Sequence, residues 1–163
     1  VIGNWCALQK AVDSGSTKSA ILAIGDNGTR RDLAEKLTGY HFPAIVHSSA
    51  VLGRAVEIGP GTVVMPGVVI ENGAKVGSHC ILNNNSIIGH NSTIGDFSHL
   101  SGCSAIGGEV YIGQGTLVGM GAAVCPQVKV GAWCKISPCS AVLRDVADGL
   151  IVFGNPARKM RLG

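Results

Sequence analysis

Aromatic residues, long apolar runs and blocks of like charge are all scarce in this chain. Aromatic side chains make up 4% of its 163 residues, whereas glycine contributes 24, a balance that favours tight corners. No apolar run approaches the roughly 20 residues of a membrane span. The net charge is only +3, with no block of Lys and Arg and no basic patch interleaved with aromatics. Binding to nucleic acid or insertion into a membrane is therefore not expected.

A six-residue repeat organises the stretch from Val46 to Val146. Every sixth position from Val46 to Val142 is aliphatic, seventeen in all and without a break, and every sixth position from Ala50 to Val146 is small. Neither a helical period of 3.6 nor a strand alternation of 2 explains such spacing. A fixed hexad predicts a parallel β-helix, in which each unit supplies one short strand and one corner. The fold class is therefore mainly β. The residue after the aliphatic is often glycine, which we expect to supply positive φ at the corner.

Three hexads make one coil, so steps of 18 residues assign the outward side chains to three faces. Face A is small and apolar, comprising Val51, Val69, Ile87, Ala105, Ala123 and Ala141. Face B is polar, comprising Glu57, Lys75, Thr93, Tyr111 and Lys129. Face C is mixed, comprising Val63, Ile81, His99, Leu117 and Lys135, with His79, Phe97 and Trp133 beside them. Apolar stripes such as A and C are rarely left exposed. We predict a closed ring in which A meets C of the next subunit, the alternative being a cover formed by the N-terminal segment.

The flanks do not follow the hexad and suggest three regions. Residues 1–45 resemble part of a small α/β unit, with a buried strand expected at 20–25, a helix at 29–37 and a stop signal at Gly39. Residues 46–146 form the β-helix, and residues 147–163 a C-terminal cap with a basic tail. Of the six cysteines, Cys80 and Cys134 occupy the small slot of the repeat. No disulfide framework is apparent, so we predict that all are reduced, in a cytoplasmic protein.

Together with the hexads, the segments AIGDNGTRRDLAEKL, IVHSSAV and GNPARKMR resemble hexapeptide-repeat acyltransferases. The likeness is to the sialic acid O-acetyltransferases and nucleotide-sugar N-acetyltransferases. It implies a left-handed β-helix, a homotrimer, and acetyl-CoA as co-substrate without a metal. The acceptor would be a hydroxyl or amino group of a sugar or nucleotide-sugar. These proteins begin with a strand and a Gly-rich loop, which this chain lacks at Val1. We expect an N-terminally truncated product with impaired sugar-nucleotide binding.

The resemblance also assigns roles to individual residues. His90 matches the catalytic histidine, a general base for the acceptor group, and His99 matches a second histidine close to the acetyl group. The family often has a carboxylate after the catalytic histidine, whereas Asn91 stands here. An amide can fix the imidazole tautomer but supports an imidazolium less well. Gly108 follows His90 by one coil, and its missing side chain is predicted to leave room for a ligand.

Further residues are candidates for binding the two substrates. We expect acetyl-CoA to lie along the groove between subunits, near the backbone of Gly108. The basic tail would meet its phosphates through Arg158, Lys159 and Arg161. Asp26 and Asn27, in the loop after the expected strand, are candidates for the sugar substrate.

Two other functions compete with acyl transfer. Some left-handed β-helix proteins are carbonic anhydrases with three histidine ligands across a subunit interface, so His79, His90 and His99 deserve consideration. The closely spaced histidine pair that those enzymes use is absent from the repeat. The other alternative is a β-helix scaffold whose catalysis is impaired by truncation. Metal analysis distinguishes a carbonic anhydrase from an acetyltransferase. A test of CoA binding distinguishes an acetyltransferase from a scaffold.

Overall fold

A computed structural model describes residues 14–15 and 19–160 of the chain. Seventeen two-residue strands follow one another at six-residue spacing, preceded by the helix α2 (Asn27–Lys36) and followed by two cap strands. The strands are β1 (Ile45–Val46), β2 (Val51–Leu52), β3 (Glu57–Ile58), β4 (Val63–Val64), β5 (Val69–Ile70), β6 (Lys75–Val76), β7 (Ile81–Leu82), β8 (Ile87–Ile88), β9 (Thr93–Ile94), β10 (His99–Leu100), β11 (Ala105–Ile106), β12 (Tyr111–Ile112), β13 (Leu117–Val118), β14 (Ala123–Val124), β15 (Lys129–Val130), β16 (Lys135–Ile136), β17 (Ala141–Val142), β18 (Ile151–Phe153) and β19 (Arg158–Lys159).

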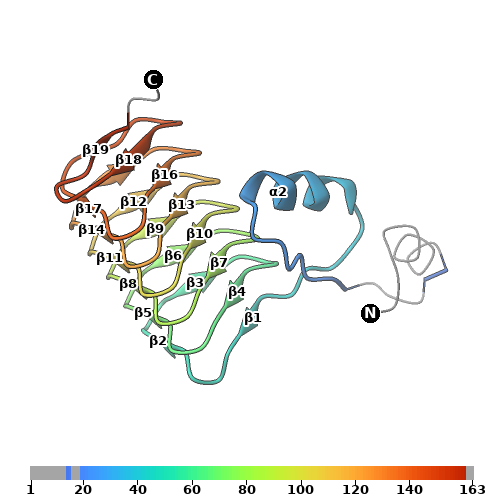
Figure 1. The fold of residues 1–163 in the computed structure, drawn as a ribbon. Coiled ribbons are helices and arrows are strands. Elements are labelled where there is room, and N and C mark those ends of the chain that lie inside the picture. Colours follow the sequence, from blue (N-terminus) through green and yellow to red (C-terminus); the bar gives the residue numbers. More distant parts are fainter. Residues whose placement is uncertain (1–13, 16–18, 161–163) are drawn as a thin grey trace.

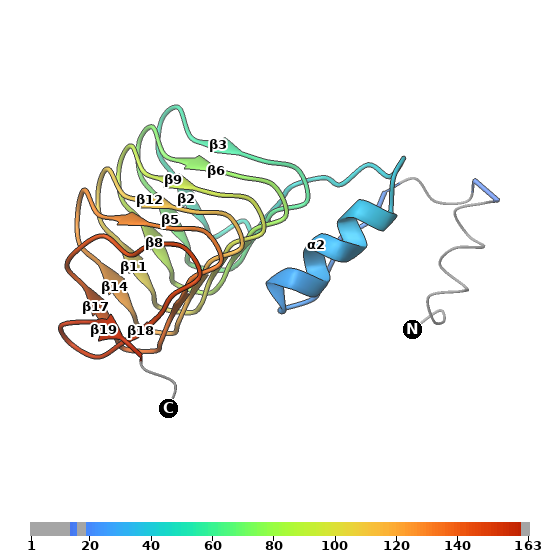
Figure 2. The same cartoon turned by 90° about the horizontal axis from the view of Figure 1, so that it is seen from above.

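The strands stack into three parallel sheets that enclose a prism (Figures 1 and 2). Face A is the outer side of β2-β5-β8-β11-β14-β17, and face B that of β3-β6-β9-β12-β15. Face C belongs to β1-β4-β7-β10-β13-β16, which β18 and β19 extend. Among β1–β17, strand pairing is parallel and follows the 18-residue step, for example Ala105 with Ile87 and with Ala123. The β-helix and its three faces are therefore confirmed.

The interior is a column of the repeat's aliphatic side chains. From Val64 to Val142 each of them is at most 4% exposed. The first coil is different, because Val46 is 40% and Leu52 43% exposed. Among the residues that the structure describes, no coil stacks beneath these two, so the prediction of a buried position was wrong for them. At the other end, β18 pairs with β16 and buries Val152, which closes the prism.

The small slot of the repeat carries hydrogen bonds between coils. Ser92 Oγ donates to the carbonyl of Gly107 at 2.8 Å and accepts from the amide of Val110 at 3.0 Å. Thr62 and Thr116 repeat this pattern on other coils. A hydroxyl thus satisfies buried backbone groups where the chain turns. Cys80 fills the same slot, and burial raises its thiol pKa to about 12, so the cysteine is an inert packing residue.

The glycines that follow the aliphatic positions serve close packing, which corrects the sequence-based expectation. A Cβ at Gly59 would lie 2.6 Å from the backbone of Gly77 in the next coil. The positive φ of each corner falls two residues later, often at a residue with a side chain, such as Asn91 at 55° and Trp133 at 55°. Glycine is therefore needed here because adjacent coils touch, and the strained φ is carried elsewhere in the corner.

The N-terminal segment was predicted in part. The helix occurs at Asn27–Lys36, with Asp26 as N-cap and Leu37 as C-cap. The expected strand at 20–25 does not form, and only an isolated bridge joins Ser19 to His41. An edge strand needs a partner along its length, and the described residues supply one at this single point. Figures 1 and 2 place α2 outside the prism, beside one of its edges.

Substitution at an interior position should cost far more than substitution on face B. Ile106→Ala should lower the free energy of unfolding by roughly 2–5 kcal/mol, because the stacked layers above and below cannot collapse into the cavity. Thr93→Ala, on face B, should stay within about 0.5 kcal/mol. Urea unfolding of the two variants measures the difference, and equal costs would show that the assignment of inside and outside is wrong.

Candidate functional site

His90 lies at the corner between faces A and B, where the chain turns from β8 to β9. Its side chain is exposed, and its Nδ1 lies 3.3 Å from the amide nitrogen of Asn91. The left-handed backbone of Asn91 brings its side chain beside the imidazole. The Asn91 Oδ1 has no hydrogen-bond partner within the described residues, so the amide can face Nδ1 with either end.

Gly108 lies one coil above His90, and the His90 ring fills the space between them. A Cβ at this position would come within 2.5 Å of His90 Nε2. The prediction that the missing side chain leaves an open gap for a ligand was therefore wrong. Gly108 instead makes room for the imidazole, which lies flat against the next coil.

A groove of about 480 Å³ begins at His90 and runs along the lower coils of face A. Its lining is small and mostly apolar, comprising Val51, Gly53, Val69, Ile70, Glu71, Asn72 and His90. The Glu71 Oε2 accepts a hydrogen bond from the backbone amide of His90 at 2.9 Å. Sequence reasoning missed Glu71. The signal was available, because the 18-residue column of Gly53, Gly89 and Gly107 contains a glutamate at this one coil.

Arg30, on α2, fixes the N-terminal segment to the corner between faces B and C. Its guanidinium donates to the carbonyls of His79 at 2.8 Å and Phe97 at 2.7 Å. The Asn27 amide adds a donor to the Gly115 carbonyl at 3.0 Å, one coil further on. Arg30 is 1% exposed, and burial lowers the pKa of its guanidinium. The sequence gives no sign of this contact, since nothing marks Arg30 apart from Arg31.

At the same corner, His79 is buried, and His99 on the adjoining strand β10 is half-buried. His79 stacks on Phe97 with ring centroids 5.2 Å apart, and its Nδ1 has no partner within the described residues. His99 Nδ1 lies 3.4 Å from the carbonyl of Gly25, and its Nε2 is likewise unpartnered. Part of face C is therefore covered by the chain's own N-terminal segment. His90 lies at a different corner of the prism, so one chain does not bring these histidines together.

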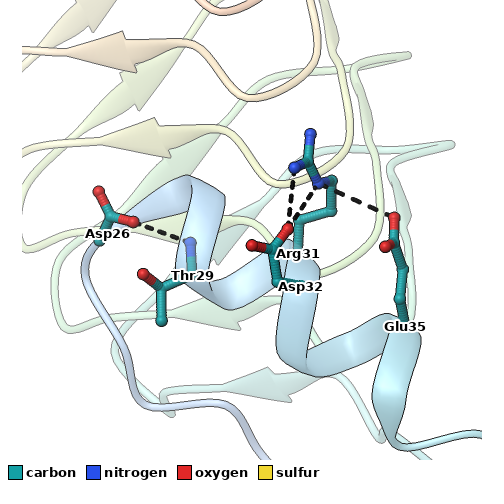
Figure 3. Close-up of polar contacts among 5 residues, drawn as sticks. All are labelled: Asp26, Thr29, Arg31, Asp32 and Glu35. Carbon is teal, nitrogen blue, oxygen red and sulfur yellow. Dashed lines mark hydrogen bonds and ion pairs between the residues drawn. The ribbon is translucent and has the colours of Figure 1, made fainter.

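Asp26 and Asn27 have structural tasks that were not anticipated. Asp26 caps α2 by accepting from the Thr29 amide at 2.8 Å (Figure 3), which lowers the pKa of its carboxyl group. Asn27 is buried, with its oxygen accepting from Arg30 and its nitrogen donating to Gly115. Asp26 still borders a pocket of about 310 Å³ whose far wall includes Trp133 and Lys135.

Two acidic residues hold Arg31 above Trp133, on the exposed side of α2. Arg31 pairs with Asp32 at 2.8 Å and with Glu35 at 3.8 Å (Figure 3). Its guanidinium carbon lies 4.8 Å from the centre of the Trp133 ring. The contact shields one face of that indole.

The basic tail forms a second pocket, at the C-terminal cap. Arg158 and Lys159 are exposed on β19 and border a cavity of about 290 Å³. Arg144 adds a third cation that sequence reasoning had passed over, from the stretch after β17. Arg161 lies outside the described residues.

Two kinds of feature are absent from the described part of the chain. No group of three or more His, Cys, Asp or Glu side chains there could hold a metal ion. No helix among those residues has the length and apolar character of a membrane span. Five cysteines are free of disulfides, and Cys6 lies outside the described residues.

A family model matches residues 39–132, that of the GMPPB C-terminal domain. Among solved structures, the perosamine N-acetyltransferase PerB of Caulobacter crescentus, in complex with CoA and GDP-perosamine, is 32% identical. Its TM-score is 0.95, over 99% of this chain and 78% of that one. The acetyltransferase domain of PglB from Neisseria gonorrhoeae, with acetyl coenzyme A, is 29% identical at TM-score 0.83, over 86% and 69% of the two chains. WeeI from Acinetobacter baumannii is 25% identical at TM-score 0.85, over 88% and 71%. Curated protein sequences gave no match.

The buried histidines predict a loss of stability in mild acid. Burial lowers the pKa of both His79 and His99, and the charge of Arg30 acts in the same direction. Below about pH 6.5, the unfolded chain binds protons that the folded chain resists. The free energy of unfolding should therefore be highest above that pH and fall as the pH drops toward 5. The slope is at most about 1.4 kcal/mol per pH unit for each proton.

Urea unfolding across this pH range measures the slope. The double variant His79→Asn, His99→Gln should show a shallower dependence, since neither replacement titrates. Asparagine suits the left-handed backbone of His79. An unchanged slope in the double variant would assign the effect to other groups.

Proposed function

Because the chain belongs to the hexapeptide-repeat β-helix sugar N-acetyltransferases, we propose that it transfers an acetyl group from acetyl-CoA to a nucleotide-linked sugar. An amino group is the acceptor that we favour over a hydroxyl, since the similar Caulobacter crescentus enzyme is named a perosamine N-acetyltransferase. The observation that carries the proposal is His90, an exposed imidazole at the mouth of a groove lined by Glu71. We place the reaction in the cytoplasm, where acetyl-CoA is available and cysteines stay reduced.

His90 is proposed as the general base. The acceptor nitrogen attacks the thioester carbonyl carbon while His90 takes its proton, and the carbon–sulfur bond then breaks. The departing thiolate takes up a proton, which the imidazolium can supply. Imidazole is the side chain that most often serves as both general base and general acid.

Asn91 selects the nitrogen of His90 that acts. With its amide nitrogen toward Nδ1, as in the structure, Nδ1 accepts and Nε2 carries the hydrogen. Turning the amide by 180° makes Nδ1 the donor and frees the Nε2 lone pair for the acceptor. Without a carboxylate at this position, the imidazolium is less stabilised than in relatives that have one, and we expect slower proton transfer.

The substrates are assigned to the surfaces beside this corner. Acetyl-CoA would approach along the coils above His90, past Gly108, with its phosphates near Arg158, Lys159 and Arg161. Asp26 is the better candidate for the nucleotide-sugar, because both ends of the Asn27 amide already have partners within the fold. The PerB chain that matches this one binds both CoA and GDP-perosamine.

A homotrimer is proposed to complete the site. Face A presents Val51 at 59% and Ile87 at 43% exposure, an apolar stripe along the sheet. It would pack on the part of a neighbour's face C that α2 leaves open. In such a trimer, His99 would approach the His90 site from the neighbouring subunit.

Removal of the base should slow acetyl transfer strongly and leave CoA binding intact. His90→Ala should lower turnover of acetyl-CoA by about 10²–10⁴-fold, the usual loss for a general base. The assay uses GDP-perosamine and related amino-sugar nucleotides as acceptors, with calorimetry for CoA binding. His47→Ala, at an exposed histidine in the first coil, is the matched control and should retain full activity.

Two results would count against this function. Unchanged turnover in His90→Ala would move the base elsewhere. Failure of the parent protein to bind CoA would favour the scaffold alternative.

A charge on face A should dissociate the trimer. Ala105→Glu places an unpaired carboxylate in the proposed interface, which costs several kcal/mol once it is buried. Sedimentation should show trimers for the parent and monomers for the variant. Thr93→Glu makes the same change on face B, beside Lys75, and should remain trimeric. A monomeric parent would contradict the proposed assembly.

A further inference from the structure

The corner that carries His90 differs from three equivalent corners in how its backbone amide is satisfied. At Arg54, Ser78 and Ala132, the amide donates upward to an Asn or Asp side chain in the next coil, at 2.7–2.9 Å. The position 18 residues after His90 is Gly108, which has no side chain to offer. Glu71 supplies the acceptor from the coil below instead.

This arrangement leaves one carboxylate oxygen of Glu71 available in the groove. Oε2 is bonded to the His90 amide, and no ion pair or second hydrogen bond to the carboxylate occurs among the described residues. The nearby Glu57, in contrast, is paired with Lys75 at 3.0 Å. Glu71 is the only acidic residue in the groove lining, beside otherwise apolar or neutral groups and the imidazole.

We propose that Glu71 is a specificity-determining residue that recognises the acceptor as a protonated amine. This inference rests on the proposed acetyl transfer and specifies its acceptor. An ammonium group in the groove can donate one hydrogen bond to the free carboxylate oxygen and another toward His90. Charge-assisted bonds of this kind are roughly twice as strong as neutral ones. A hydroxyl acceptor offers a single proton and no charge, so the groove discriminates against it.

The bound ammonium becomes a nucleophile by losing one proton. His90 accepts that proton, and the nitrogen lone pair attacks the thioester carbonyl carbon. Nitrogen carries positive charge again in the tetrahedral intermediate, where the carboxylate of Glu71 stabilises it. The nitrogen then loses its second proton to solvent, the carbon–sulfur bond breaks, and the departing thiolate takes the first proton from the imidazolium, which leaves the amide and the CoA thiol. Glu71 itself gains and loses no proton.

The competing explanation is that Glu71 only holds the His90 backbone. Glu71→Gln separates the two roles, because the glutamine oxygen still accepts from the His90 amide while the charge is lost. Glu71→Ala removes both. Glu57→Gln makes the matched change on face B and should leave kinetics unchanged.

The experiment measures kcat and KM with whichever acceptor the parent uses best, GDP-perosamine or dTDP-4-amino-4,6-dideoxyglucose. The comparison substrate is the same nucleotide sugar with a hydroxyl group in place of the amine. Glu71→Gln should raise KM for the amine on the order of 10- to 100-fold, the equivalent of one charge-assisted hydrogen bond. CoA binding should not change. The ratio of kcat/KM for the amine acceptor to kcat/KM for the hydroxyl acceptor should fall.

A pH series supplies a readout that a purely structural role would not move. In the parent, KM should rise above the pKa of the acceptor's amine, because only the ammonium form is recognised, and this rise should disappear in Glu71→Gln. If Glu71→Gln behaves as the parent while Glu71→Ala is impaired, Glu71 is structural and this inference is wrong, although the proposed function stands. If the parent acetylates none of the acceptors, the proposed function fails and the inference fails with it.

Discussion

The distance between successive coils constrains every other feature of this protein. Strands in a sheet stack about 4.8 Å apart, and at the corners the backbones come close enough to exclude a Cβ. At Gly59 that atom would lie 2.6 Å from the next coil, and at Gly107 2.6 Å from Pro126. Several large corner side chains lie against a glycine of the adjacent coil. His79 lies against Gly61, and Trp133 against Gly115.

His90 shows the same arrangement, and the candidate site follows from it. The imidazole can lie along the corner because Gly108 offers no side chain. The missing side chain also removes the usual acceptor for the His90 amide, which Glu71 then replaces from below. The three residues are thus parts of one local change in the repeat. Together they place a base and a carboxylate on the same groove.

The N-terminal segment is attached by a different kind of interaction. Arg30 and Asn27 use side-chain donors on carbonyls that three successive coils present at one corner, from His79 to Gly115. A buried guanidinium without a carboxylate partner is stable here because its donors reach carbonyl oxygens and the Asn27 amide. As a consequence, His79 is buried and His99 half-buried, each with one ring nitrogen that has no hydrogen-bond partner among the described residues. Face C is consequently less available to a neighbouring subunit than face A.

The coil, the three faces, the interior column above the first coil and a helix at 29–37, found at Asn27–Lys36, could all be predicted from the sequence. Each of these depends on a short local period or on a cap, so position in the chain decides whether a side chain points inward or outward. Tertiary structure alone decided that Arg30 reaches His79 and Phe97, 49 and 67 residues away. It also decided that the imidazole of His90 fills the space beside Gly108, and that residues 20–25 form no strand, because the bridge to His41 is made at Ser19. These outcomes depend on which non-repetitive groups meet across the fold, and a hexad pattern holds no information about segments that lie outside it.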